Sequence, residues 1–156
     1  MKAAVVFYSL DGNCSLVAQE LKTLINADLI QLQTLDEKKR SFLGKMLRGG
    51  GMVVMGKKPP LKPYTFDPAE YDLLVIGVPV WAGSPAPPIK TFLSGAGISG
   101  KKIAIFVCHA GGMRGALDKL KSLLPENEIV AEANFVNPSK NRGEAKRQIA
   151  DWVKKL

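Results

Sequence analysis

Three short stretches of the chain are almost entirely apolar, a pattern typical of strands that are buried on both faces of a sheet. These stretches run from Ala3 to Tyr8, from Leu73 to Val80 and from Ile103 to Cys108. Two others, from Asp28 to Gln33 and from Glu128 to Val136, mix polar with apolar residues. The pattern therefore predicts three central strands and two strands nearer the edges of a sheet.

Amphipathic helices are predicted between these strands. Apolar residues spaced about 3.6 positions apart mark helix faces from Leu16 to Ile25, from Leu117 to Leu124 and from Ala145 to Leu156. A shorter helix from about Ile89 to Leu93 follows a proline-rich loop, and proline suits the first turn of a helix. Strands and helices thus alternate along the chain.

This alternation predicts an α/β fold, in which a parallel sheet is covered by helices on both faces. A five-stranded sheet of the order 2-1-3-4-5 places the second and fifth strands at its edges, which agrees with their mixed polarity. The length of 156 residues fits one domain. We therefore predict a single domain over residues 1–156, built on a three-layer, doubly wound, five-stranded parallel sheet.

The segment from about 36 to 66 fits this alternation least well. Apolar residues from Phe42 to Leu47 predict a short helix, the glycines from Gly49 to Gly51 end it, and later prolines predict an extended return. Eight basic residues and no acidic residue lie between Lys38 and Lys62. Two interpretations stay open: a solvent-exposed helix and loop, or a docking surface for an acidic partner.

Composition narrows the class of protein. Hydrophobic residues make up 46% of the chain and charged residues 23%, ordinary values for a soluble globular protein. The longest nearly unbroken apolar run, Leu73 to Gly83, has eleven residues, whereas a membrane-spanning helix needs about 20. Two cysteines and one histidine are too few for a disulfide scaffold or a structural zinc site, and no secretory signal is evident. We therefore expect a cytoplasmic protein without a metal site.

The chain is basic, with 22 lysines and arginines against 14 acidic residues and a net charge of +8. Such a charge attracts nucleic acid, an anionic cofactor or an acidic protein. The basic residues are spread along the chain, aromatic residues are only 7%, and no recognition helix or stacking platform is evident. These features argue against nucleic acid as a partner.

The loop from Ser9 to Ser15 follows a buried strand and opens a helix. Amides at a helix start lack partners within the helix and carry partial positive charge, so a phosphate group can bind there. The hydroxyls of Ser9 and Ser15 and the amide of Asn13 add donors, and Gly12 allows close approach. Because the loop lacks the fingerprints of triphosphate and dinucleotide sites, it predicts either a site for a single phosphate or an ordinary turn.

Two further loops follow central strands. Trp81, in the loop from Pro79 to Pro88, either plugs the core or stacks on a planar ligand. In the predicted sheet, Trp81 and the first loop flank the crevice where ligands bind in such folds. The third loop, from Cys108 to Gly115, contains glycines that allow a flat ligand to approach closely.

The third loop also permits a different chemistry. Cys108 and Arg114 have the spacing of cysteine-dependent phosphatases, in which loop amides and the arginine hold phosphate while a thiolate attacks. Gly115 stands where such enzymes usually have a hydroxyl residue, and no aspartate in the loop suits a general acid. A phosphatase is therefore kept as a distant alternative.

Two longer motifs resemble one known family. YSLDGNCSLVAQEL, from Tyr8 to Leu21, resembles the phosphate-loop signature of the flavodoxin-like family, with Cys14 where the family usually has threonine. DLLVIGVPVWAGSPAPPIKTFL, from Asp72 to Leu93, resembles the family's third strand and flavin-facing loop. The third glycine loop follows at a suitable distance, so that the resemblance covers nearly the whole chain. It implies a flavodoxin fold that binds FMN without a covalent link.

The resemblance implies three groups of FMN-binding residues. The phosphate lies against Ser9, Leu10, Asp11, Gly12, Asn13 and Cys14; the isoalloxazine ring packs on Pro79, Val80, Trp81, Ala82 and Gly83; its other edge is covered by Cys108, His109, Ala110, Gly111 and Gly112. No catalytic side chain is expected, because the flavin carries the redox chemistry. A carbonyl between Trp81 and Gly83 is expected to accept a hydrogen bond from the reduced flavin, since glycine lets a peptide change orientation.

Two functions share this site. In the first, the protein carries electrons between redox partners, and the basic segment docks an acidic redox protein. In the second, it is an NAD(P)H-dependent reductase that passes electrons from FMN to a quinone or another small acceptor. The sequence contains no separate dinucleotide fingerprint, which favours the carrier.

Overall fold

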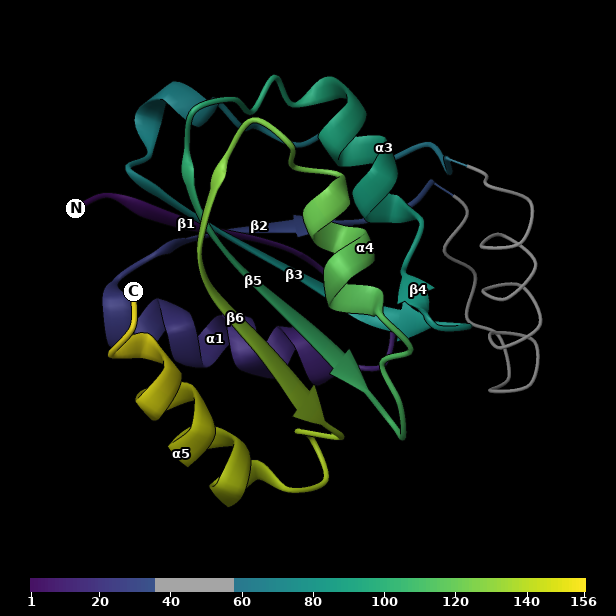
Figure 1. The fold of residues 1–156 in the computed structure, drawn as a ribbon, viewed down its shortest axis with the longest axis vertical. Helices are drawn as coiled ribbons and strands as arrows, with labels where there is room; N and C mark the ends of the chain where they lie inside the picture. The colour runs from purple at the N-terminus through teal and green to yellow at the C-terminus, as the bar shows by residue number, and fades with distance from the viewer. Residues whose placement is uncertain (36–57) are drawn as a thin grey trace.

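The computed structural model describes residues 1–35 and 58–156. Within these residues, five long strands lie parallel in one sheet (Figure 1). They are β1 (Ala3–Tyr8), β2 (Asp28–Leu32), β3 (Leu73–Trp81), β5 (Lys102–His109) and β6 (Glu128–Val136). Their order across the sheet is β2-β1-β3-β5-β6. The order 2-1-3-4-5 predicted for the long strands is therefore confirmed.

A further strand, β4 (Ser84–Pro85), was not predicted, because two residues are too few to leave a sequence pattern. It pairs antiparallel with the end of β3, so that Val80 faces Pro85 and Trp81 faces Ser84. The turn between them has positive φ angles at both positions, 48° at Ala82 and 72° at Gly83. Positive φ at both central residues is the requirement of a type I′ hairpin turn. The Trp81 loop therefore begins as a tight hairpin.

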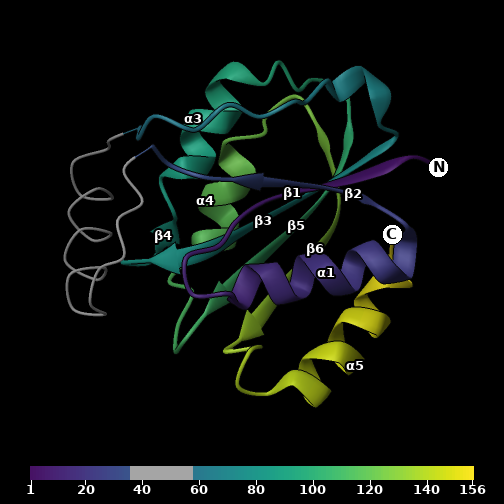
Figure 2. The same cartoon turned by 180° about the vertical axis from the view of Figure 1, so that it is seen from behind.

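Helices cover both faces of the sheet (Figures 1 and 2). α1 (Asn13–Ile25) and α5 (Arg142–Val153) lie on one face, and α3 (Pro88–Gly95) and α4 (Ala116–Ser122) lie on the other. A short 3-10 helix, η1 (Pro68–Glu70), precedes β3. The predicted three-layer arrangement is confirmed.

Alternate residues of the central strands face opposite helical layers, which explains why their sequences are unbroken apolar runs. In β1, Val5 and Phe7 pack in the layer of α1 and α5, whereas Val6 and Tyr8 pack in the layer of α3 and α4. All residues of β1 are buried. The edge strands β2 and β6 are buried at only some positions, as their mixed polarity predicted.

Only the last part of the basic segment lies within the described residues. Leu61 forms an antiparallel bridge with Thr34, and the Lys62 N–H donates to the Gln33 carbonyl at 2.7 Å. The chain from Lys58 onward thus passes the carboxyl end of β2. The helix predicted from Phe42 to Leu47, with the glycines after it, lies outside the described residues.

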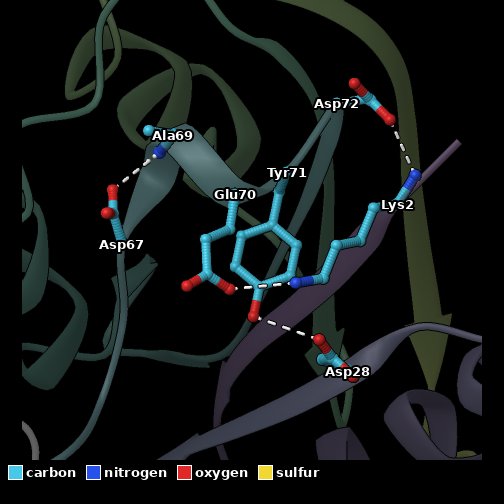
Figure 3. A network of polar contacts seen from close by, with 7 residues as sticks. All are labelled: Lys2, Asp28, Asp67, Ala69, Glu70, Tyr71 and Asp72. Carbon is cyan, nitrogen blue, oxygen red and sulfur yellow. Dashed lines mark hydrogen bonds and ion pairs between the residues drawn. The ribbon is translucent and has the colours of Figure 1, made fainter.

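Polar contacts tie together the amino-terminal ends of β1, β2 and β3 (Figure 3). The Lys2 amide donates to the Asp72 carboxylate at 2.7 Å, and the Lys2 ammonium pairs with Glu70 at 2.9 Å. The Tyr71 hydroxyl donates to Asp28 at 3.1 Å, and burial raises the pKa of Tyr71, so that it keeps its proton. This network closes the end of the sheet opposite to the loops of the predicted site.

Residues 1–35 and 58–156 lack two kinds of feature. No helix there combines the length and the apolar character that crossing a bilayer requires. No group of three or more histidine, cysteine or acidic side chains there is arranged to hold a metal ion.

Candidate functional site

Three loops meet at the carboxyl ends of three neighbouring strands. Residues 9–12 follow β1, the turn at Ala82 and Gly83 follows β3, and residues 110–115 follow β5. Because β1, β3 and β5 are adjacent and parallel, their carboxyl ends lie at the same end of the sheet. In open α/β sheets, this end is where ligands bind. The structure therefore brings together the three groups of residues selected from the sequence.

Residues 9–14, referred to below as the cradle, lead from β1 into the first turn of α1. Gly12 has a φ of 86°, and a Cβ placed on it would meet no atom within 4 Å. The Leu16 amide donates to the Gly12 carbonyl at 3.0 Å, and the Ser15 amide donates to the Ser9 hydroxyl oxygen at 3.2 Å. The amides of Asn13 and Cys14 come before the first helical hydrogen bond, so they have no carbonyl partner within α1. Open space beside such amides suits a phosphate group.

Leu10 and Asp11, the other two residues of the cradle, differ in burial. Leu10 packs against the core layer of α3 and α4. Asp11 is exposed.

Two side chains of the first loop are engaged elsewhere. The Asn13 side-chain carbonyl accepts hydrogen bonds from the Ser139 amide at 3.1 Å and from the Ser139 hydroxyl at 2.7 Å. The Cys14 thiol is only 1% exposed and lies beside Cys108, and burial raises its pKa well above the usual value. The structure therefore leaves Cys14 only its backbone amide to offer to the cradle.

The hairpin presents an aromatic side chain beside the cradle. Trp81 is partly exposed, and its ring meets the ring of Tyr8 edge to face, with centroids 5.7 Å apart and an interplanar angle of 83°. Pro79 and Val80 are partly buried in β3, and Ala82 is exposed at the tip. Trp81 thus has one contact with the core and a surface that a planar ligand can cover, which combines the two interpretations made from the sequence.

The tip of the hairpin is held by a side chain of α4. The Lys119 ammonium donates to the Gly83 carbonyl at 2.8 Å and to the Ser84 hydroxyl at 3.0 Å. A Cβ on Gly83 would lie 2.9 Å from the Cβ of Arg114, so only glycine permits this approach. The Gly83 carbonyl, which lies in the stretch expected to reorient, is therefore already engaged. Lys119 was not predicted as a site residue, because no pattern along the chain links positions 83 and 119.

The third loop is organised around the side chain of His109. The His109 Nδ1 accepts from the Gly112 amide at 3.0 Å, and its Nε2 lies 3.2 Å from the side-chain oxygen of Asn134. Since Nδ1 accepts, we infer that the proton sits on Nε2 and is donated to Asn134. Ala110 and Gly111 are exposed between these anchors. The histidine thus shapes the loop, and Asn134, like Ser139, was missed because it comes from a distant strand or loop.

Cys108 and Arg114 are not arranged as the phosphatase alternative requires. Cys108 is 2% exposed and belongs to the core layer of α1 and α5. Arg114 is exposed and packs on Gly83. A buried thiol and an arginine that lies against the hairpin do not surround one phosphate, as the phosphatase mechanism requires.

Comparison with known proteins decides the family. A family model described as flavodoxin matches residues 2–156. The chain belongs to the flavodoxin family. The search of curated proteins gave no match.

Solved structures share the flavodoxin-family fold at low sequence identity. A flavoprotein from Lactobacillus acidophilus NCFM, in complex with FMN, is 21% identical, with a TM-score of 0.75 over 91% of this chain and 97% of that chain. Two-electron reduced Megasphaera elsdenii flavodoxin is 16% identical, with a TM-score of 0.62 over 99% of both chains. General stress protein 14 from Treponema denticola, in complex with FMN, is 11% identical, with a TM-score of 0.63 over 99% of this chain and 97% of that chain.

Proposed function

We propose that this flavodoxin-family protein binds FMN without a covalent link and carries electrons between redox partners. One observation carries the proposal: the open, amide-lined cradle at Gly12 follows β1, and the hairpin with the partly exposed Trp81 follows the neighbouring β3. A small anionic group and a planar ring can be bound side by side at such a site. FMN has both a phosphate and a planar ring. The match to the flavodoxin family and the FMN bound in two similar solved structures support FMN as the ligand.

In this proposal, the protein binds and orients the cofactor. The Ser9 hydroxyl and the amides of Asn13 and Cys14 hold the phosphate. Trp81 stacks on the ring, and residues 109–112 cover its other edge, whereas Cys108 is buried in the core. FMN supplies the one-electron and two-electron chemistry when it is bound, so that no side chain is needed as an acid or a base.

We also propose an acidic redox protein as the partner. Lys58 and Lys62 are exposed, and the segment that contains them passes the carboxyl end of β2. The carboxyl end of the sheet is also the end that carries the three loops. A net charge of +8 favours encounter with an acidic surface.

The first test is an absorption spectrum of the purified protein, recorded before and after FMN is added and the excess is removed. Retained bands at about 375 and 450 nm, together with a stoichiometry of about one FMN per chain, are expected of a flavin site. Protein that retains no flavin after this treatment contradicts the proposal.

A second test separates the carrier from the NAD(P)H-dependent reductase. Stepwise reduction of the loaded protein with a chemical reductant should show a one-electron state that accumulates, as a single-electron carrier needs. Rapid bleaching of the 450 nm band by NADPH alone, at about one equivalent per flavin, would instead establish the reductase.

A further inference from the structure

The β3–β4 hairpin has little support of its own. Its register pairs are Val80 with Pro85 and Trp81 with Ser84, and the Ala86 amide donates to the Pro79 carbonyl at 3.0 Å. Isolated hairpins this short are marginal in water. The turn also contains Ala82 at a φ of 48°, a conformation that is uncommon for residues with a Cβ. The orientation of this hairpin therefore depends on contacts with the rest of the molecule.

Lys119 supplies such a contact from a firmly packed helix. It lies in α4, between Ala116 and Leu120, which are both fully buried. The ammonium reaches across to the hairpin and donates to two acceptors, the Gly83 carbonyl at 2.8 Å and the Ser84 hydroxyl at 3.0 Å. Hydrogen bonds from a charged donor are stronger than neutral ones, and two of them restrict the direction of the tip as well as its distance.

The two residues that Lys119 contacts lie next to Trp81 in the hairpin. Gly83 is separated from Trp81 only by Ala82, and Ser84 is the residue paired with Trp81 across the hairpin. The Trp81 ring itself meets the Tyr8 ring edge to face, with the two centroids 5.7 Å apart. Trp81 is thus fixed between a contact at the end of β1 and a tip that Lys119 holds.

We propose that Lys119 is a positioning residue of the FMN site, which holds the hairpin tip and thereby orients the Trp81 indole before the cofactor binds. The inference rests on the proposed function, because it names what Trp81 is oriented for. If the indole is already held in its bound orientation, FMN binding loses less conformational entropy of the protein. Lys119 therefore contributes to affinity without touching the phosphate cradle.

The first arm of the test needs no cofactor. Hydrogen exchange is measured on the flavin-free protein for Lys119→Met, Lys119→Arg and the control Lys121→Met. Lys121 lies on the same helix and pairs with Asp118 and Glu132, each at 3.0 Å, so that its replacement removes the same charge without touching the hairpin. Amide exchange from Trp81 to Ser84 should become about fivefold to tenfold faster in Lys119→Met alone. Exchange at the wild-type rate, or equal acceleration in Lys121→Met, overturns the proposal.

The second arm measures FMN binding by the same variants. Lys119→Met should weaken FMN binding about fivefold and change the shape of the visible band of the bound flavin, since the indole no longer lies in one orientation over the ring. Lys119→Arg, which keeps the charge and can donate twice, should restore both properties, and Lys121→Met should keep them. A loosened hairpin with unchanged FMN affinity and spectrum contradicts the positioning role. If the wild-type protein itself binds no FMN, the proposed function fails, and the exchange data alone decide whether Lys119 holds the hairpin.

Discussion

At the scale of single residues, several glycines occupy places where one extra carbon atom changes packing or binding. Gly77, in the middle of β3, lies directly under the Phe106 ring, and a Cβ there would be 1.9 Å from the Phe106 Cζ. Phe106 itself packs edge to face against Phe135 and Trp152, with centroids 6.0 and 6.1 Å away. The absence of a side chain at Gly77 therefore makes room for an aromatic cluster in the core.

Gly77→Ala should destabilise the fold by about 2–3 kcal/mol, because the added methyl group has no space and the ring must move. Urea denaturation of the variant measures this loss. A smaller side chain at position 106 should remove the steric clash. The double variant Gly77→Ala with Phe106→Leu should therefore lose less stability than the sum of the two single variants. Simple additivity of the two losses would show that the close contact is not the cause.

Gly12 offers a test of the cradle with a matched control. Gly12 and Gly97 both have positive φ angles, 86° and 61°, and a Cβ on either meets no atom within 4 Å. Gly12→Ala and Gly97→Ala should therefore carry a similar backbone strain of about 1 kcal/mol, measured by thermal unfolding. Only Gly12→Ala should weaken FMN binding, by about tenfold or more, because its methyl group enters the space proposed for the phosphate. Equal FMN affinity of the two variants would place the phosphate elsewhere.

At the scale of elements, the start of α1 is joined to the loop between β6 and α5. Both hydrogen bonds of this junction end on one atom, the Asn13 side-chain oxygen, which accepts from the Ser139 amide and hydroxyl. The helix that opens the cradle is thus anchored to a segment more than one hundred residues later in the chain. Any role of Asn13 in binding combines this anchoring with the amide that it offers to a phosphate.

Substitutions at Asn13 separate the two roles. Asn13→Ala leaves the Ser139 donors without their acceptor and should cost about 1–3 kcal/mol of folding stability. Asn13→Asp keeps an acceptor and places a negative charge in the first turn of a helix, so that most of the stability should remain. The same charge beside the phosphate should still weaken FMN binding about tenfold, as isothermal titration can measure. Full FMN affinity in Asn13→Asp would contradict the position of the cradle.

At the scale of the whole molecule, the two ends of the sheet differ in chemistry. The amino-terminal end is closed by the paired charges and hydrogen bonds around Lys2, Tyr71 and Asp72 (Figure 3). The carboxyl-terminal end carries the three loops of the candidate site and the exposed Lys58 and Lys62. An acidic partner that approached the carboxyl-terminal end would meet both the basic side chains and the proposed FMN.

Charge reversal tests where the partner docks. Lys58→Glu with Lys62→Glu should slow electron transfer to an acidic redox protein about tenfold at low salt, with a smaller effect at high salt because ions screen the interaction. Lys102→Glu with Lys155→Glu makes the same change in net charge away from the site and should have little effect. Stopped-flow measurements of flavin oxidation over a range of salt concentrations compare the two pairs. Equal slowing by both pairs would indicate that net charge, rather than a docking surface, controls the rate.

The layered fold and the loops of the candidate site could be predicted from the pattern of residues along the chain. Apolar runs such as Ala3–Tyr8 have only one stable placement, between two covering layers, and the mixed polarity of β2 and β6 assigned them to the edges. In the resulting strand order, β1, β3 and β5 are neighbours, so the loops that follow them must meet at one end of the sheet. Local patterns suffice for these features, because burial and helix starts are set by residues near one another in the chain.

Which side chains serve the site and which serve the fold became clear only from the packed structure. The Cys14 thiol proved to face Cys108 in the core, His109 shapes its own loop, and Lys119 reaches the hairpin from another helix. Each of these roles depends on the distance and direction between residues that are remote in sequence. Periodicity fixes the face on which a side chain lies, but the partner that it meets there is set only when the layers pack.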